Sequence, residues 1–474
     1  MLRRPGAAAA AAAAVLPPAA AAATPIAPAA RARTRRPPSV VVAMAAPASP
    51  ASSPPAPATT SSAWARRHCP DPHQQELPAL LAAVEAACRR ISARVQRAGL
   101  EGTRGYASGG GGAEGGGGVR NASGDAQKKL DVISDGIFAA ALAEGGLVRC
   151  YASEEAEAPV VLLAPKAAAA GAAAARRRRA RYVVVFDPLD GSRNVDVAIP
   201  TGTIFGVYES AAWAREQGGG EGAGGDGGGG GGGEGTLRSG SQGGPVLLPA
   251  YGADEALADV LQPGSRLLAS GYCLYSSTVV LALALAGDGA GAGEGDSGAD
   301  AGPPSAAAPP SAAAPVAAAF ALDTLTGDFV ATHDPLVAPS RGQIYSLNDA
   351  RFDDWAPGLR RYVSDVRAGK GQTGKQYSAR YVCSLVADLH RTLLQGGWCG
   401  NPRSHLRLVY EGNPLAFLTE AAGGCASDGA RRVLSIAPAR THQRLPLFLG
   451  SAEDVAEVES YGDVQQTGGK TYAV

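Results

Sequence analysis

The chain has 474 residues, with 43 basic and 43 acidic side chains, so its formal charges cancel at neutral pH. This balance gives no electrostatic case for nucleic acid, and no apolar stretch of about 20 residues would span a bilayer, so neither partner is expected. The 64 glycines and 34 prolines gather in runs that bury little apolar surface, so the folded part is shorter than the length suggests.

The N-terminal segment, residues 1–70, contains no Asp or Glu but has eight arginines among Ala, Pro, Ser and Thr. An arginine-rich, serine-containing and acid-free N-terminus is typical of an organelle transit peptide. The alternative is a disordered tail of biased composition. We expect this segment to lie outside the folded domain, which then begins near Gln74.

Hydrophobic periodicity predicts the first elements of the folded part. Apolar side chains in residues 77–100 recur at spacings of three and four, which indicates an amphipathic helix that ends near Gly99. A second helical pattern covers residues 128–142. Further along, short apolar runs predict strands at 182–186, 204–208, 344–347 and 406–410, and helices at 382–394 and 415–422.

Three low-complexity segments interrupt the folded sequence, at residues 166–180, 218–244 and 287–315. Their Gly, Ala and Pro content predicts disordered surface loops. Without them, we divide the folded part into an N-terminal half, 74–265, and a C-terminal half, 266–465. Strands and helices alternate without a strict repeat, which favours an α/β (α+β) fold with layered sheets.

A pair of carboxylates follows directly on the predicted strand at 182–186. Pro188 restricts the backbone between Asp187 and Asp190, and Gly191 permits a tight turn after them. Oxygen ligands of this kind prefer Mg²⁺ or Mn²⁺ to zinc, and the amides that follow Asp190 can bind phosphate oxygens.

More carboxylates lie at the boundaries of other predicted elements. They are Asp125, Asp131, Glu154, Glu155 and Glu411. Any one of them alone is best explained as a solvated charge or a helix cap. As a set they would repel one another unless cations neutralise them, so the pattern indicates metal-assisted chemistry on a phosphate.

Longer motifs occur in a consistent order along the chain, at residues 124–134, 152–155, 186–192, 202–206, 379–392, 406–411 and 442–450. In these motifs the sequence resembles class I fructose-1,6-bisphosphatases, most closely the chloroplast branch, over about residues 75–460. The resemblance implies the layered fold of the fructose-bisphosphatase/inositol-phosphatase superfamily. It also implies hydrolysis of the 1-phosphate of fructose 1,6-bisphosphate to fructose 6-phosphate, a homotetramer, and a location in the chloroplast stroma.

The same resemblance assigns roles by position. It implies two or three Mg²⁺ ions per subunit, with Mn²⁺ able to substitute, held by Asp125, Glu154, Asp187, the Leu189 carbonyl, Asp190 and Glu411. Asp131 and Glu155 would activate the attacking water. Asp190, Gly191, Ser192 and Arg407 would hold the phosphate that is removed. Asn348, Arg380, Tyr381 and His405 would contact the far phosphate of the sugar, with Arg380 reaching in from a neighbouring subunit.

Several positions depart from the family pattern. They are Arg193 in place of Ser, Arg351 and Asn401 in place of Tyr, Cys383 in place of Gly, and His405 in place of Lys. Because most of these changes fall in the expected substrate pocket, we expect reduced or altered affinity for fructose 1,6-bisphosphate. Three alternatives therefore stand beside that activity: a sedoheptulose-1,7-bisphosphatase, an inositol-phosphate-type phosphatase, and a catalytically weakened homologue with a regulatory role.

The seven cysteines form no Cys-x-x-Cys pair, and most are expected to be buried thiols. The redox-regulated chloroplast enzymes carry cysteines in an insertion after the strand that corresponds to residues 204–208. Here no cysteine lies between Cys150 and Cys273, so we expect no redox switch of that kind.

Overall fold

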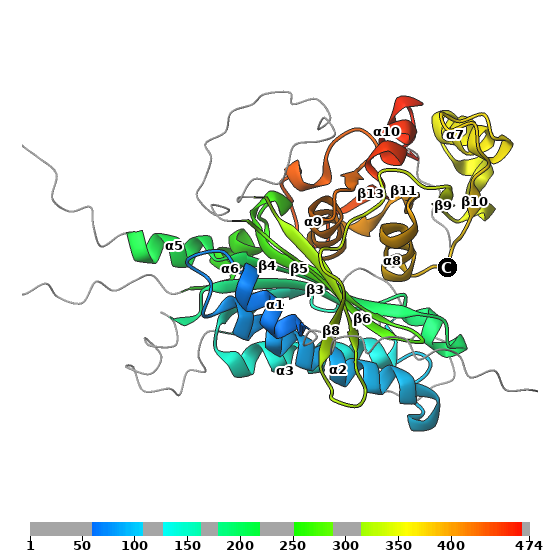
Figure 1. Cartoon of the computed structure of the whole chain (residues 1–474). Helices are drawn as coiled ribbons and strands as arrows, with labels where there is room; N and C mark the ends of the chain where they lie inside the picture. Colours follow the sequence, from blue (N-terminus) through cyan, green and yellow to red (C-terminus); the bar gives the residue numbers. More distant parts are fainter. Residues whose placement is uncertain (1–58, 108–126, 163–178, 219–250, 288–313, 467–474) are drawn as a thin grey trace, which may run out of the picture. The chain divides into compact units, whose positions relative to one another are not determined.

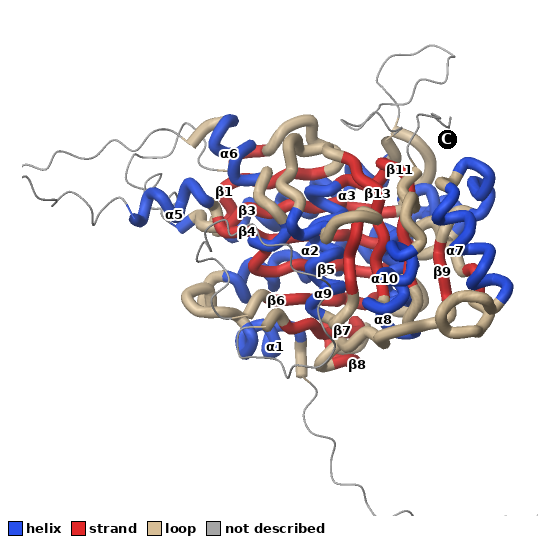
Figure 2. The backbone as a smooth tube through the Cα atoms, turned by 90° about the horizontal axis from the view of Figure 1, so that it is seen from above, coloured by secondary structure: helices blue, strands red, loops and turns tan. Residues whose placement is uncertain are grey.

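A computed structural model describes residues 59–107, 127–162, 179–218, 251–287 and 314–466. All of them belong to one unit, Pro57–Val474. Within these residues the fold is built on an eight-stranded and a five-stranded sheet, each covered by helices (Figures 1 and 2). The expected α/β class with layered sheets is confirmed.

The large sheet has the strand order β2-β1-β3-β4-β5-β6-β7-β8. β1 and β3 are parallel, and the other neighbouring strands are antiparallel. The strands are β1 (Val148–Ser153), β2 (Val160–Val161), β3 (Tyr182–Asp190), β4 (Thr201–Glu209), β5 (Leu267–Tyr275), β6 (Val279–Leu285), β7 (Val316–Leu322) and β8 (Phe329–His333).

Both faces of the large sheet are buried, as its central strands show. In β3, Val183 and Val185 belong to one apolar cluster, whereas Tyr182, Val184 and Phe186 belong to another on the opposite face. This explains why the strand reads as a continuous apolar run, because residues of both parities are in a core.

The second cluster lies under α1 (Ser61–His68), α2 (Leu77–Glu101) and α3 (Lys129–Gly145). The opposite face packs on α8 (Leu385–Gln395) and α9 (Asn413–Ala421), which also contact the small sheet. Figure 1 shows these two groups of helices on either side of the large sheet. Because α8 and α9 contact both sheets, the end of β3 and the ends of the small-sheet strands lie in one region of the molecule.

The small sheet has the order β10-β9-β11-β13-β12. Its outer face buries Trp355, Trp398 and Phe448 against two further helices, α7 and α10. The remaining elements are β9 (Ile344–Ser346), β10 (Ser378–Ala379), β11 (Trp398–Arg407), β12 (Cys425–Ser427), β13 (Arg444–Gly450), α5 (Ala211–Gly218), α6 (Ala253–Val260), α7 (Pro357–Ala368), α10 (Ala452–Ser460) and the short helical turns Ser192–Val197, Gly264–Arg266, Asp349–Asp354, Leu408–Gly412 and Val433–Ser435.

The N-terminal boundary predicted near Gln74 is wrong. The described fold already includes α1, which packs on the core through Trp64, and this side chain is 1% exposed. The Trp64 indole N–H donates to Asp334 Oδ1 at 3.0 Å. The rest of the predicted leader, residues 1–58, lies outside the described residues, as do most of the three predicted insertions.

The predicted division at 265/266 also differs from the structure, because β5 begins at Leu267 and pairs with β4 inside the large sheet. The change of sheet comes later, between β8 and β9. The helix predicted from 77 continues past Gly99 to Glu101, where Gly102 adopts a left-handed conformation and ends it.

Two predicted elements near the C-terminal half need correction. Helix α8 starts at Leu385 rather than at 382, because Cys383 has a positive φ of 63°. The predicted strand at 406–410 ends at Arg407, and Leu408–Gly412 form a π-helical turn instead. That turn faces Glu411 into the interior, where it is 3% exposed.

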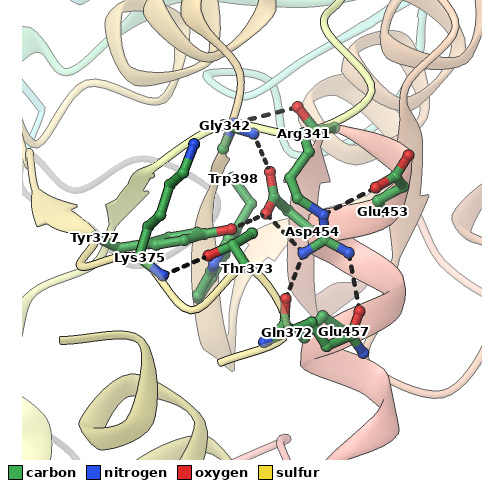
Figure 3. Close-up of polar contacts among 12 residues, drawn as sticks. Arg341, Gly342, Gln372, Thr373, Lys375, Tyr377, Trp398, Glu453, Asp454 and Glu457 are labelled. Atoms are coloured by element: carbon green, nitrogen blue, oxygen red, sulfur yellow. Dashed lines mark hydrogen bonds and ion pairs between the residues drawn. The ribbon is translucent and has the colours of Figure 1, made fainter. Parts of the chain in front are cut away.

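The glycine-rich loop after α7 is pinned to α10 by polar contacts (Figure 3). Arg341 Nη2 donates to Gln372 at 2.9 Å, and the Gln372 amide donates to Glu457 at 2.7 Å. Arg341 also pairs with Glu453 at 2.9 Å and with Glu457. These contacts give the loop a structural role, because they hold it against α10.

Among the described helices, none combines the length and apolar composition needed to cross a membrane.

Candidate active site

A cavity of about 320 Å³ lies between the C-terminal end of β3 and the small sheet. Its lining brings together most residues singled out from the sequence: Asp131, Glu154, Glu155, Asp187, Leu189, Asp190, Gly191, Ser192, Asn348, Tyr381, His405, Arg407 and Glu411. The segments that supply them are separated by up to hundreds of positions in the chain, so the cavity exists only in the folded protein.

The turn at the end of β3 is fixed by local hydrogen bonds. Asp187 Oδ1 accepts from the Leu189 amide at 2.9 Å, and the Pro188 carbonyl accepts from the Thr203 hydroxyl at 2.8 Å. Gly191 has a φ of 73°, and a Cβ there would lie 3.0 Å from the Ser384 Cβ. A larger residue would therefore meet both backbone strain and a contact with Ser384.

Three buried carboxylates converge beside this turn. Ligand oxygens of Asp187, Asp190 and Glu411 lie within 4.8 Å of one another, and all three side chains are at most 9% exposed. Burial, with repulsion from neighbouring acids, raises the pKa of Asp187 well above its usual range. Burial likewise raises the pKa of Asp190 to about 6 and that of Glu411 to about 8.

Arg407 provides the nearest positive charge to this cluster. Its guanidinium lies 2.7 Å from Glu154 Oε1 and 3.9 Å from Glu411 Oε1, and its backbone amide also donates to Glu411. The π-helical turn after β11 makes this possible, because it returns Glu411 to the amide four residues earlier. One arginine does not balance the four acids around it, and its other face lines the cavity.

Asp131 lies at the start of α3, where its Oδ2 caps the helix. It accepts from the Lys128 amide at 2.8 Å and from the Ser192 hydroxyl at 3.3 Å. Its Oδ1 is buried and has no hydrogen-bond partner among the described residues. Burial raises the pKa of Asp131 to about 7, with the charge of Glu154 adding to the shift. A carboxyl tuned in this way can exchange a proton near neutral pH.

The donor set fits a hard divalent cation. Asp187, Asp190 and Glu411 present oxygen atoms in a buried cluster, and the charge of Glu154 also acts on Asp187, so these like charges favour a bound cation over mutual repulsion. Carboxylate oxygens without His or Cys are the ligands of Mg²⁺ or Mn²⁺ rather than of zinc. The Leu189 carbonyl borders the same cavity, whereas Asp125 lies outside the described residues.

Basic side chains also line the cavity, and we call them its basic wall. Arg193, Arg351, Arg403 and His405 all border the cavity, together with the amides of Asn348 and Asn401. Four of the five departures from the family pattern therefore lie in this wall, and the fifth, Cys383, borders the same cavity. The charge distribution suits an elongated anion with one phosphate at the acidic cluster and another at the basic wall.

Arg380 and Glu155 were both expected at the site, but only Glu155 lines the cavity. Arg380 is exposed and is not among the residues that line the cavity; its guanidinium donates to the Ala379 carbonyl at 2.8 Å. Glu155 lines the cavity and accepts from the Gln127 amide at 2.5 Å.

Sequence reasoning missed Ser384. Its hydroxyl donates to Asp190 Oδ2 at 2.8 Å, and the Val386 amide donates to the same oxygen at 3.0 Å. Ser384 is the N-cap of α8, so one residue both starts the helix and orients a carboxylate of the cluster. A serine directly before an apolar helical pattern was the available signal for the cap, but not for its contact with Asp190.

Comparisons with known proteins agree with this geometry. Residues 65–294 match the family model described as "Fructose-1-6-bisphosphatase, N-terminal domain", and residues 338–463 match "Fructose-1-6-bisphosphatase, C-terminal domain". The chain is 37% identical over 395 residues to the chloroplastic fructose-1,6-bisphosphatase of Pisum sativum, covering 81% of this chain and 78% of the relative. It is 36% identical over 392 residues to that of Brassica napus, covering 81% and 77%.

A solved structure is similar over most of its length. The holo form of Leishmania major fructose-1,6-bisphosphatase matches with a TM-score of 0.62 and 28% identity, covering 86% of this chain and 99% of that one. The two family models together span strands β1 to β6 of the large sheet and the whole small sheet, while β7 and β8 lie between the two matched segments. The chain therefore belongs to the fructose-1,6-bisphosphatase family.

Proposed function

We propose that the chain hydrolyses fructose 1,6-bisphosphate in a Mg²⁺-dependent reaction that releases the 1-phosphate and leaves fructose 6-phosphate. Membership of the family supports the phosphatase activity. The observation that carries the proposal is that one cavity is lined both by a buried acidic cluster and by several basic side chains. A sugar bisphosphate has an anionic group for each part, the reacting phosphate at the cations and the second phosphate at the arginines.

The residues around the acidic cluster have complementary roles. Bound Mg²⁺, with Mn²⁺ able to substitute, would spread the negative charge of the transferring phosphoryl group. Asp187, Asp190, Glu154 and Glu411 would hold two or three such ions, with Asp125 and the Leu189 carbonyl. Arg407, with the amides of the turn at Gly191 and Ser192, would orient the reacting phosphate.

Proton transfer is assigned to Asp131, with Glu155 beside the same cavity. The unpartnered Asp131 Oδ1 would accept a proton from the attacking water while the water oxygen forms the new bond to phosphorus. The bond between phosphorus and the sugar oxygen breaks, and that oxygen takes up a proton from solvent to become the hydroxyl at position 1, while Asp131 returns the proton it accepted to solvent. Asn348, Tyr381 and His405 would hold the far phosphate.

Two further properties are part of the proposal. Arg380 is exposed and does not line the cavity of its own chain, which is compatible with a homotetramer in which it completes the site of a neighbour. The chloroplastic relatives and the acid-free N-terminal segment support delivery to the chloroplast stroma by a transit peptide.

Steady-state phosphate release on fructose 1,6-bisphosphate and sedoheptulose 1,7-bisphosphate, with and without Mg²⁺, tests the function. The second substrate is a real candidate because Arg193, Arg351 and His405 line the wall that would contact the far phosphate. We expect Mg²⁺-dependent release from the fructose substrate and its loss in Asp190→Asn. A higher kcat/KM for the seven-carbon sugar would favour the alternative enzyme. Absence of release from both substrates would leave an inositol-phosphate-type phosphatase or a regulatory homologue.

A further inference from the structure

The motif around His442 has no part in the function described so far, yet its side chain joins two turns of the site. His442 Nδ1 lies 2.8 Å from the Tyr410 hydroxyl, and its Nε2 lies 3.3 Å from the Glu157 carbonyl. The rings of His442 and Tyr410 meet edge to face, with centroids 5.7 Å apart. Tyr410 is fully buried, so the contact fixes the histidine against the core.

The partners define how the ring is protonated. A carbonyl oxygen can only accept, so Nε2 carries the hydrogen and donates to Glu157. In the neutral ring Nδ1 is then the acceptor for the Tyr410 hydroxyl. His442 therefore uses both nitrogens at once, with one bond to each turn.

The backbone of the same motif reinforces the contact. The Gln443 carbonyl accepts from the Leu408 amide at 2.7 Å, at the first residue of the π-helical turn. The next residue, Arg444, pairs with Arg407 across β13 and β11. The motif thus holds the π-helical turn by its backbone and reaches the turn after β1 through the His442 imidazole.

Each turn carries one acid of the metal cluster. Glu411 directly follows Tyr410, and Glu154 lies on the turn after β1, three positions before Glu157. Glu411 and Glu154 contact the Arg407 guanidinium at 3.9 and 2.7 Å, respectively. The distance between these two acids therefore determines how far apart the metal ligands lie on that side of the site. Two turns from different sheets carry the acids, and the imidazole spans the gap between them.

We propose that His442 is a positioning residue that fixes the separation of Glu154 and Glu411 and thereby sets the metal affinity of the site. This rests on the proposed function, because it requires these two acids to bind the metal. Loss of a group that orients metal ligands commonly weakens metal binding by about 10- to 100-fold. We therefore expect His442→Phe, which keeps the ring but removes both nitrogens, to weaken Mn²⁺ binding by at least about 10-fold.

The test measures Mn²⁺ binding to the full-length protein without substrate, from the electron paramagnetic resonance signal of free Mn²⁺. The matched control is His390→Phe. His390 makes the same kind of contact, with Nδ1 2.8 Å from the Tyr272 hydroxyl and the rings edge to face, but this contact joins α8 to β5 and involves neither acid-bearing turn. A merely structural loss would appear in both variants, whereas loss of positioning appears only in His442→Phe.

Two further variants keep the inference open to refutation if stability falls. Tyr410→Phe removes the same hydrogen bond from its other end, so combining it with His442→Phe should add little. His442→Gln retains an N–H that can reach Glu157, and it should recover part of the affinity. The KM for the sugar bisphosphate at saturating metal should change less than the metal dissociation constant in every variant.

Glu411→Gln separates this inference from the proposed function. If Glu411→Gln binds Mn²⁺ as tightly as the wild type, the metal site itself is wrong. If Glu411→Gln loses binding while His442→Phe and His390→Phe both bind Mn²⁺ normally, the metal site stands and the role of His442 is refuted. Equal weakening in the two histidine variants would also refute it.

Discussion

Replacing Glu411 by Gln should stabilise the metal-free protein at alkaline pH while removing the response to Mg²⁺. Glu411 is 3% exposed and shares the buried cluster with Asp187 and Asp190. Burial raises its pKa from 4.5 to about 8, with Arg407 opposing the shift and Glu154 adding to it. Glutamine has nearly the same shape, and its amide oxygen can still accept from the Arg407 amide, so the substitution mainly removes a charge.

The size of the effect follows from linkage between protonation and folding. An acid with a raised folded pKa contributes its stability below its unfolded pKa and loses that contribution as the pH rises towards the folded value. With pKa values of 4.5 unfolded and about 8 folded, and about 1.4 kcal/mol per unit, the loss from Glu411 between pH 6 and pH 8 is about 2 kcal/mol. Glu411→Gln should remove that part of the slope.

Urea unfolding in EDTA at pH 6, 7 and 8, repeated with excess Mg²⁺, would measure this. Mg²⁺ at 100 times its dissociation constant should add about 3 kcal/mol to the wild type and little to the variant. Glu85→Gln is the control, because Glu85 is also a buried acid with a raised pKa but lies on α2 outside the cluster. It should keep the full Mg²⁺ response. A Glu411→Gln variant with the wild-type pH slope would refute the reasoning.

Three other outcomes are expected. Asp131→Asn should lower kcat at saturating Mg²⁺ by about 100-fold or more, because it removes the proposed base; an unchanged kcat would contradict that role. Trp64→Ala should lower the free energy of unfolding in urea by about 3–5 kcal/mol, since the indole fills the core beneath α1, and a change under 1 kcal/mol would place α1 outside the cooperative fold. His405→Lys should lower the KM for fructose 1,6-bisphosphate in steady-state assays, because lysine supplies a fixed positive charge at neutral pH; a KM that stays the same or rises would contradict this.

The layered class and the central strands β3 and β4 of the large sheet could be predicted from the sequence, because burial on both faces leaves an unbroken apolar run. The convergence of carboxylates at the end of β3 followed from the same pattern. α1 could not be predicted, since its alanine, serine and arginine composition matches that of the segment before it. Its place depends on a contact between Trp64 and Asp334, 270 positions apart.

Two features of the active site also depend on contacts between distant segments of the chain. The residues before Glu411 have the pattern of a strand, but Leu408–Gly412 form a π-helical turn. This turn depends on a tertiary contact, in which the Leu408 amide donates to the Gln443 carbonyl. Ser384 has an obvious local role as a helix cap, but its bond to Asp190 joins residues 194 positions apart. Local patterns report local structure, and these contacts arise only when distant segments meet.

The hairpin of β6 and β7 has a consequence for protein engineering. Leu285 pairs with Val316, so β6 ends and β7 begins at adjacent positions of the sheet. The free energy of closing a connection between two paired strands grows only with the logarithm of its length, by about 0.6 kcal/mol for each doubling. None of the residues that line the cavity comes from these two strands. A fluorescent reporter or an affinity domain could therefore be spliced in at this point without disturbing catalysis.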